Sequence, residues 1–257
     1  MTDFTPTPER QRQILSLLTK QRRLSVAEIV EQFSVSEATA RRDLESLASE
    51  GKVQRVHGGA LAVEQAPPEL PILERENEQA DEKVRIGRAT AELIVDKETV
   101  FLGSGTTVLE VARNLRNRKN LTVITNSLPV LNALAGIKEI TVISLGGMLR
   151  DSELSFIGHI TEQALAEVRV DKVVIGTHGI SLEHGLTNDY LQETLTDRAI
   201  LKIGKEVVVV ADHSKVNRVS TVLLAPLDVM DTFVTDSSTE KKFVQSLRKQ
   251  NVNVVVA

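Results

Sequence analysis

A short segment in the middle of the chain combines glycines and hydroxyl side chains in a pattern typical of anion-binding loops. Gly103 to Thr107 follow an apolar run, Thr99 to Leu102, and lead into a segment with helical character. At such a strand-to-helix turn, backbone amides and the positive end of the helix dipole point at one place, where anions bind. The hydroxyls of Ser104, Thr106 and Thr107 add hydrogen-bond donors. This chemistry suits a phosphate group.

Two common phosphate-binding loops do not match this segment. A dinucleotide-binding loop requires a third glycine, where this chain has Val108, and an acidic residue after the next strand, where it has Asn126. A P-loop ends in Gly-Lys-Ser or Gly-Lys-Thr, and the sequence contains neither. A plain strand-to-helix turn without a ligand remains the alternative.

Polar or glycine-rich segments also follow several later apolar runs. In an open α/β sheet, ligands bind at the carboxyl ends of the strands, so these segments are expected to converge on one cleft. Asn126 can bond a sugar hydroxyl, and Lys215 can neutralise a phosphate as a point charge. Aromatic residues make up only 3% of the chain, which leaves little material for stacking a nucleobase and favours a small anionic ligand. The candidate effector-binding residues are Ser104, Gly105, Thr106, Thr107, Asn126, Ser127, Gly147, Gly179 and Lys215.

Patterns for catalysis or metal binding are weak. Asp212-His213-Ser214 contains the residue types of a hydrolase triad, but neighbours in one loop cannot easily align side chain to side chain. The five histidines have no ligand-like spacing, and the absence of cysteine excludes disulfides and thiolate metal sites. We predict no catalytic residue, no metal and no cofactor, and we favour ordinary loop roles for His178 and His213.

The first sixty residues predict the elements of a DNA-reading surface. Apolar periodicity indicates helices over residues 9–21, 25–33 and 36–49. Ser25 and Glu28 have the spacing of a capping box, which starts the second of these helices. Three short helices with a tight turn before the last one indicate a helix-turn-helix. Residues 52–61 then carry valines on either side of polar residues and a glycine pair, which indicates a two-stranded wing.

The third predicted helix has an apolar and a basic side. On a helical wheel Ala40, Leu44 and Leu47 form the buried face, and Arg42 lies nearly opposite them. Arginine can bind a guanine edge with two hydrogen bonds, and basic residues of the wing can hold phosphates. A solvated helix with an ordinary arginine pair is the alternative. The candidate DNA-binding residues are Ser36, Thr39, Arg41, Arg42, Lys52, Arg55, His57 and Gly58.

Charge is distributed unevenly along the chain. The formal net charge is −4, yet residues 10–60 contain nine Lys and Arg against six Asp and Glu. The remainder carries 22 basic and 29 acidic residues. The basic part coincides with the predicted DNA-reading surface, so double-stranded operator DNA is the expected partner.

From residue 81 onward, short β-branched runs alternate with helical segments. Continuous apolar runs such as Val207 to Val210 are typical of strands buried on both faces of a parallel sheet, and the alternation indicates an α/β fold. We predict a winged helix-turn-helix at residues 1–61, a proline-containing linker at 62–80, and a larger α/β domain for effector sensing and oligomerisation at 81–257. The expected strands are Thr99–Leu102, Leu121–Thr125, Ile140–Leu145, Lys172–Gly176, Glu206–Ala211, Val222–Leu224, Thr232–Thr235 and Val252–Val256.

The motifs together resemble one family of bacterial regulators. The segment from Ser34 to Leu44, with the wing residues Arg55 to Ala60, closely resembles the DeoR family of transcription regulators. The resemblance implies that the helix with Thr39, Arg41 and Arg42 recognises an operator. Farther along, the resemblance to the DeoR C-terminal sensor domain is carried by Gly105-Thr106-Thr107, Thr125-Asn126-Ser127, Leu145-Gly146-Gly147, Gly179-Ile180-Ser181 and Ala211-Asp212-His213-Ser214-Lys215.

The family resemblance also implies a ligand class. The DeoR sensor domain is similar to ribose-phosphate isomerases, and in the family it binds phosphorylated sugars or related metabolites. Many relatives have aspartate where this chain has Gly103, a departure that bears on which sugar is accepted. We expect a transcription regulator, a repressor of sugar-metabolism genes controlled by a phosphorylated sugar, and not an enzyme.

An enzyme remains the alternative function. A sugar-phosphate isomerase-like enzyme fused to a DNA-binding head needs a general base, for which Asp212 and Glu193 are available. The fused head, and the absence of an acid at Gly103, favour sensing. Two-fold operators require paired heads, so a homodimer or homotetramer is expected. With no secretory signal and no apolar run long enough to cross a bilayer, we expect a cytoplasmic protein without membrane contact.

Overall fold

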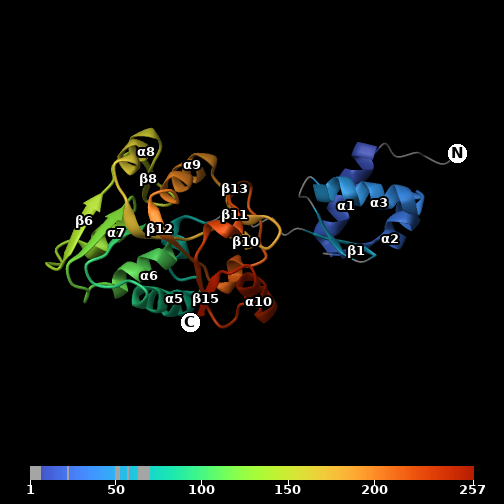
Figure 1. The fold of residues 1–257 in the computed structure, drawn as a ribbon. Coiled ribbons are helices and arrows are strands. Elements are labelled where there is room, and N and C mark those ends of the chain that lie inside the picture. Colours follow the sequence, from blue (N-terminus) through green and yellow to red (C-terminus); the bar gives the residue numbers. More distant parts are fainter. Residues whose placement is uncertain (1–6, 22, 50–52, 57, 63–69) are drawn as a thin grey trace. The chain divides into compact units, whose positions relative to one another are not determined.

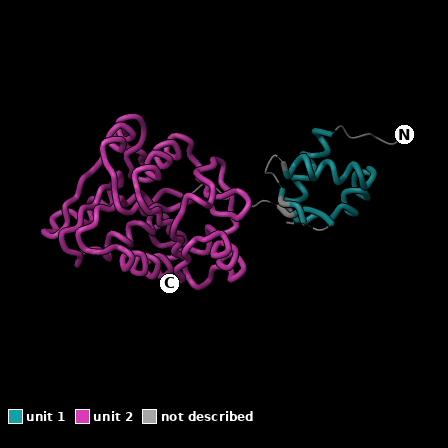
Figure 2. The backbone as a smooth tube through the Cα atoms, in the orientation of Figure 1, with its two compact units in different colours: residues 1–65 teal, residues 66–257 magenta. Residues whose placement is uncertain are grey.

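The computed structural model describes residues 7–21, 23–49, 53–56, 58–62 and 70–257. The chain divides into two compact units, residues 1–65 and residues 66–257, shown in different colours in Figure 2. Each unit has hydrophobic cores of its own, one in the first unit and two in the second. Among the described helices, none is long and apolar enough to span a membrane.

The first unit is a three-helix domain with a small sheet (Figure 1). Its helices pack around Ile14, Ile29 and Leu44, all without exposed surface. The strands pair antiparallel in the order β1-β3-β2, so the predicted wing gains a third strand that the sequence reading missed. The elements are α1 (Thr7–Gln21), β1 (Arg23–Ser25), α2 (Val26–Phe33), α3 (Glu37–Ser49), β2 (Val53–Val56) and β3 (Gly59–Ala62).

The predicted capping box begins α2. The Ser25 hydroxyl accepts a hydrogen bond from the Glu28 amide at 3.2 Å, and the Glu28 carboxylate accepts one from the Ser25 amide at 2.6 Å. Each bond satisfies an amide that the helix itself leaves without a partner. The bonds that the Glu28 carboxylate accepts from the Ser25 hydroxyl, at 2.6 Å, and from the Ser25 amide lower the pKa of Glu28. The start of α2 is therefore fixed by Ser25 and Glu28, two residues three positions apart.

A buried ion pair joins α1 to α3. Arg10 donates to both carboxylate oxygens of Asp43, at 2.6 and 3.2 Å, and both side chains are almost completely buried. Two parallel bonds between a guanidinium and a carboxylate hold orientation as well as distance. The pair therefore fixes the rotation of α3 against α1.

The second unit contains a seven-stranded sheet in which every pairing is parallel. Side chains alternate between its two faces. On β4, Val100 and Leu102 belong to one core and Phe101 to the other. The sheet order is β15-β14-β12-β9-β4-β5-β6. Its strands are β4 (Thr99–Leu102), β5 (Leu121–Thr125), β6 (Ile140–Ser144), β9 (Val170–Ile175), β12 (Gly204–Val210), β14 (Thr232–Thr235) and β15 (Asn253–Val256).

Helices cover both faces of this sheet, which confirms the predicted α/β class. Three helices share a core with Val100, namely α5 (Ala80–Glu92), α6 (Thr106–Asn114) and α7 (Leu128–Leu134). Three others share the core of Phe101, namely α8 (His159–Ala166), α9 (Leu191–Ile200) and α10 (Lys241–Lys249). Burial on both faces explains why the strands read as continuous apolar runs.

One predicted strand lies outside the large sheet. The Val222–Leu224 run forms β13 (Val222–Ala225), which pairs antiparallel with β11 (Gly185–Asn188). That strand in turn pairs with β10 (Gly179–Ser181). A separate hairpin consists of β7 (Met148–Arg150) and β8 (Ser155–Ile157), and two 3-10 turns are η1 (His213–Lys215) and η2 (Leu227–Val229).

The linker is shorter than the predicted range of residues 62–80. Residues 63–69 lie outside the described residues, whereas residues 70–80 pack into the second unit. A short helix there, α4 (Ile72–Arg75), is fixed by a bond from the Ile72 amide to the Ser152 carbonyl at 2.7 Å. Pro71, which the sequence analysis placed in the linker, stands at the N-cap of this helix.

Candidate effector site and DNA-reading surface

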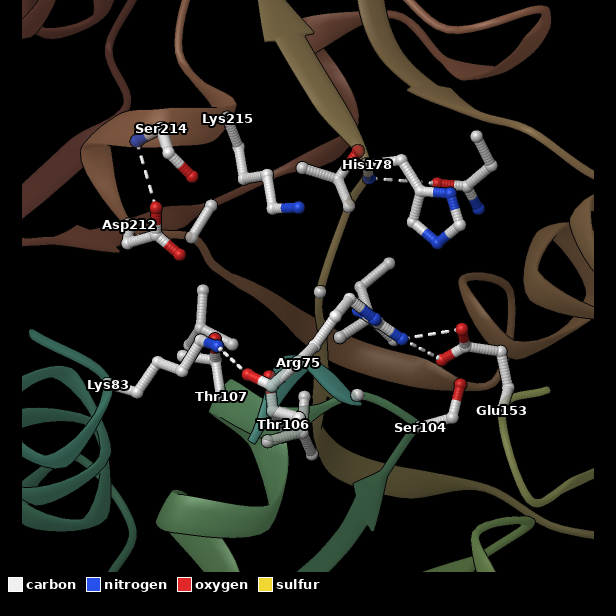
Figure 3. Close-up of a pocket in the computed structure, with 18 of the residues that line it drawn as sticks. Arg75, Lys83, Ser104, Thr106, Thr107, Glu153, His178, Asp212, Ser214 and Lys215 are labelled. Atoms are coloured by element: carbon white, nitrogen blue, oxygen red, sulfur yellow. Dashed lines mark hydrogen bonds and ion pairs between the residues drawn. The ribbon is translucent and has the colours of Figure 1, made fainter. Parts of the chain in front are cut away.

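A pocket lies at the carboxyl ends of three adjacent strands of the parallel sheet, β4, β9 and β12 (Figure 3). The segments that follow these strands line it with Ser104 to Val108, with Gly176 to His178, and with Ala211, Asp212, Ser214 and Lys215. The helices α4, α5 and α9 complete the wall, together with the turn between β7 and β8. This is the position at which open α/β sheets bind ligands.

The N-terminus of α6 supplies amide donors to this pocket. Gly105 stands at its N-cap with φ +112°, a conformation that favours glycine, and no side chain caps the helix. The next two residues, Thr106 and Thr107, are 5% and 8% exposed. Within the described parts of the chain neither hydroxyl has a hydrogen-bond partner, and both line the pocket. Each residue is largely buried, but its hydroxyl oxygen keeps accessible surface, so this end of α6 can donate to acceptor atoms of a ligand in the pocket.

Two lysines bring positive charge to the same pocket (Figure 3). Lys83 of α5 is 4% exposed, and its ammonium donates to the Arg75 carbonyl at 2.7 Å. Burial lowers the pKa of Lys83, and the nearby Asp212 carboxylate opposes that shift. Lys215 of η1 was predicted for the site, whereas Lys83 was not. The signal was in the sequence, because Lys83 falls on the face of its helix that also carries Ile86 and Thr90.

The rest of the wall carries carboxylates, two of which are paired with arginines. Arg75 donates to both oxygens of Glu153, at 2.5 and 2.6 Å, and both residues are buried. Arg150 of β7 binds Glu193 of α9, and its guanidinium also lies 4.7 Å from the centre of the Tyr190 ring. In each pair the arginine neutralises its glutamate, so neither pair adds net charge to the pocket wall.

The pocket does not include four of the predicted effector residues, Asn126, Ser127, Gly147 and Gly179. Each has contacts within the fold. Asn126 donates to the Phe156 carbonyl at 3.0 Å, and Ser127 caps α7 by accepting a bond from the Val130 amide. The two glycines lie where a Cβ atom would meet other groups within 2.1 to 2.9 Å. These contacts lie outside the pocket, and the Asn126 Oδ1 atom is buried without a hydrogen-bond partner among the described residues, so the role of these four residues in effector binding stays a prediction.

In the first unit, α3 presents the predicted DNA-reading side chains. Arg42 is exposed, with no ion-pair or hydrogen-bond partner in the described part of the chain, whereas Arg41 binds Glu37 at 2.5 Å. At the start of the helix, Ser36 accepts a bond from the Thr39 amide at 3.2 Å, and the two hydroxyls lie 2.9 Å apart.

The wing supplies a second basic group. Arg55 donates to the Gly59 carbonyl at 2.7 Å and is partly exposed, while Gly58 turns the chain with φ +81°. The other two predicted wing contacts, Lys52 and His57, lie outside the described residues.

Comparison with known families covers both units of the chain. The family described as "DeoR C terminal sensor domain" matches residues 78–237. The family described as "DeoR-like helix-turn-helix domain" matches residues 10–66.

Similar proteins extend over nearly the whole chain. The Transcriptional repressor AccR of Agrobacterium fabrum is 35% identical over 97% of this chain and 98% of its own length. The Glycerol-3-phosphate regulon repressor of Escherichia coli is 35% identical over 96% of this chain and 97% of its own length. Among solved structures, ribose 5-phosphate isomerase A from Methanocaldococcus jannaschii overlaps partly, with a TM-score of 0.40 and 21% identity over 54% of this chain and 55% of that chain.

Proposed function

Since this chain belongs to the DeoR family of transcription regulators, we propose that it represses sugar-related genes and that a phosphorylated sugar controls its binding to operator DNA. The helix-turn-helix makes it a DNA-binding regulator. Its relatives in Agrobacterium fabrum and Escherichia coli are named as repressors, and the second is named for the glycerol-3-phosphate regulon. These names support the repressor role and the phosphorylated effector.

The phosphate assignment rests on one observation, the end of α6. Open amides, two hydroxyls that have no hydrogen-bond partner among the described residues, and the ammonium groups of Lys83 and Lys215 all line one pocket. Amide donors at a helix N-terminus and nearby lysines are the groups that bind phosphate in many proteins. A phosphate dianion would also stabilise the charged form of Lys83, which burial disfavours.

The proposed readers of DNA are the exposed groups of α3 and the wing. Arg42 supplies a guanidinium that is not engaged within the described part of the chain, and Thr39 and Arg55 lie on the same unit. We propose that α3 enters the major groove with Arg42 on a guanine edge. Paired heads on a two-fold operator require a homodimer or homotetramer.

We propose sensing rather than catalysis for the pocket. Glu193, one candidate base, is engaged in an ion pair with Arg150. The other candidate, Asp212, is buried and accepts a bond from the Ser214 amide at 2.8 Å. Neither of these two carboxylates is therefore an unengaged base, and no cofactor or metal is part of the proposal.

A pair of substitutions at Thr106 tests the proposed function. Thr106→Asp places a carboxylate where the phosphate is proposed to lie, and like charges repel. The variant should fold and bind operator DNA but no longer respond to phosphorylated sugars. The control, Thr106→Ser, keeps the hydroxyl and should respond nearly as the parent does.

Titration calorimetry with the phosphorylated and unphosphorylated forms of the same sugar gives the direct measurement. The parent should bind only the phosphorylated form with appreciable affinity. Equal binding of both forms, or a Thr106→Asp protein that responds like the parent, would show that the phosphate site is misassigned.

A further inference from the structure

A second group of polar side chains lines the pocket beside the proposed phosphate site. It consists of His178, which follows β9, Asn188 at the end of β11, and Asp197 of α9. The Asn188 amide nitrogen donates to Asp197 Oδ2 at 2.9 Å, while its oxygen accepts a bond from the His178 amide at 3.3 Å. Asn188 is thus held from both ends, and it orients the Asp197 carboxylate in the pocket wall.

Asp197 differs from the neighbouring carboxylates in its charge balance. Glu153 is paired with Arg75, and Glu193 is paired with Arg150. Asp197 has no ion-pair partner among the described residues, and a single amide donates to it. An ionised carboxylate accepts up to about four hydrogen bonds. The group therefore retains acceptor capacity that faces a ligand pocket.

The charges around Asp197 leave it near its titration point at neutral pH. Burial raises the pKa of Asp197 to about 7, although His178 and Arg150 lower it and the amide of Asn188 favours the charged form. Glu153 acts in the opposite direction and raises it. Any donor that a ligand brings to this carboxylate shifts the balance toward the ionised form.

We propose that Asp197 and Asn188 form the subsite that binds the hydroxyl groups of a sugar whose phosphate lies at the end of α6. The proposal rests on the proposed function, because it assigns the other end of the same ligand. A sugar hydroxyl donates the bond that Asp197 lacks, and charge-assisted bonds of this kind are about twice as strong as neutral ones. Glu153 and Glu193 are already neutralised by arginines, so an uncharged polyol can bind Asp197 without breaking either ion pair.

The first test needs no variant. The affinity of the full-length protein is measured by calorimetry at pH 6 and pH 8 for two probes, the tightest binder in a panel of pentose and hexose phosphates and methyl phosphate. Both probes are phosphate monoesters and share a second pKa near 6, so the ratio of their affinities isolates the sugar hydroxyls. This ratio should rise about tenfold from pH 6 to pH 8 as Asp197 ionises. A ratio that stays constant or falls overturns the proposal.

The second test uses Asp197→Asn, which preserves shape and an acceptor for Asn188. Sugar-phosphate affinity at pH 8 should fall about tenfold, the pH dependence of the ratio should disappear, and methyl phosphate should bind within twofold of the parent. An Asp197→Asn protein that binds the sugar phosphate as the parent does overturns the subsite but leaves the phosphate site standing. If neither probe binds the parent, the proposed function itself fails.

Discussion

At the scale of single residues, α3 carries two adjacent arginines with different surroundings. Arg41 is held by Glu37 one turn earlier in the helix, an arrangement that directs its guanidinium along the helix surface. Arg42 has no such restraint within the described residues and lies on the side opposite the buried Leu44. The identical side chains are therefore not equivalent as DNA readers, and Arg42 can reach a base edge without first breaking an ion pair.

This difference makes Arg42→Ala the sharpest test of DNA reading. The variant should lose about 1–3 kcal/mol of operator affinity and discriminate less between operator and scrambled DNA. Arg12→Ala is the matched control, because Arg12 is exposed on α1. Band shifts on both DNAs measure the effect, and an unchanged preference in Arg42→Ala removes this residue from the reading surface.

Lys83 provides the corresponding test in the pocket. Lys83→Met keeps a long side chain but removes the buried ammonium, so sugar-phosphate affinity should fall at least about tenfold, or about 1.4 kcal/mol. The fold should persist, because the substitution also removes the desolvation cost of a buried ammonium, which the lowered pKa of Lys83 reflects. Calorimetry compares this variant with Lys119→Met on the exposed surface. Equal affinities for the two variants would exclude Lys83 from the site.

At this scale the sequence predicted only part of the site. Ser104 to Thr107 and Lys215 line the pocket, because a strand-to-helix turn has a local pattern of glycine and hydroxyl residues. Lys83 and Asp197 could not be found in the same way, because helices distant in sequence carry them into the wall. Asn126 lies outside this pocket and donates to the Phe156 carbonyl, a contact that its position after a strand does not reveal.

At the scale of elements, the head depends on the buried pair of Arg10 and Asp43. Asp43→Asn leaves a buried guanidinium without its counter-charge, which should destabilise the head by about 3–5 kcal/mol. Operator binding should be lost with it, because α3 is no longer fixed against α1. The control is Glu37→Gln, which breaks an exposed ion pair on the same helix and should cost no more than about 1 kcal/mol. Thermal unfolding of the two full-length variants measures their stability. Equal losses of stability in Asp43→Asn and Glu37→Gln would mean that burial of the Arg10–Asp43 pair is irrelevant.

The close packing of α5 on α6 depends on Gly87. A Cβ atom there would lie 2.6 Å from Glu110 Cβ and 2.7 Å from its carbonyl carbon. Gly87→Ala should therefore destabilise the second unit, despite the gain of about 1 kcal/mol that alanine usually brings to a helix. It should also weaken phosphate binding, since α5 carries Lys83 and α6 carries Thr106. Gly146→Ala, at a site with open space, serves as the control for thermal unfolding. A more stable Gly87→Ala protein would contradict this account.

The long elements were predictable and the short ones were not. All seven strands of the parallel sheet correspond to apolar runs, and burial on both faces explains the continuous run of inner strands such as β12. The three-residue strands β7, β8 and β10 leave no such run, since they pair locally and outside the large sheet. The helix α4 was likewise missed among prolines, although its Ile72 and Arg75 are buried.

At the scale of the whole molecule, we expect the second unit to carry the contacts between protomers. It exposes apolar side chains that a monomer would leave in water, among them Met148 and Leu195, which line one shallow pocket with Ile160. A fragment of residues 70–257 should form dimers or larger species in light scattering, and Ile160→Glu should dissociate them. The control is Val95→Glu, another exposed apolar position away from this pocket. A monomeric fragment beside an oligomeric full-length chain would place the interface in the head or the linker.

The two units have separate hydrophobic cores, and the boundary between them falls within residues 63–69, which lie outside the described residues. A boundary of this kind is a place where genes can recombine without damage to either product. Evolution can then change the promoter that the head binds while the second unit keeps its effector, or change the effector while the promoter stays the same. The same boundary offers an engineer a grafting point. A head that recognises a chosen promoter, joined before residue 70, would place a reporter gene under the control of this protein's own metabolite.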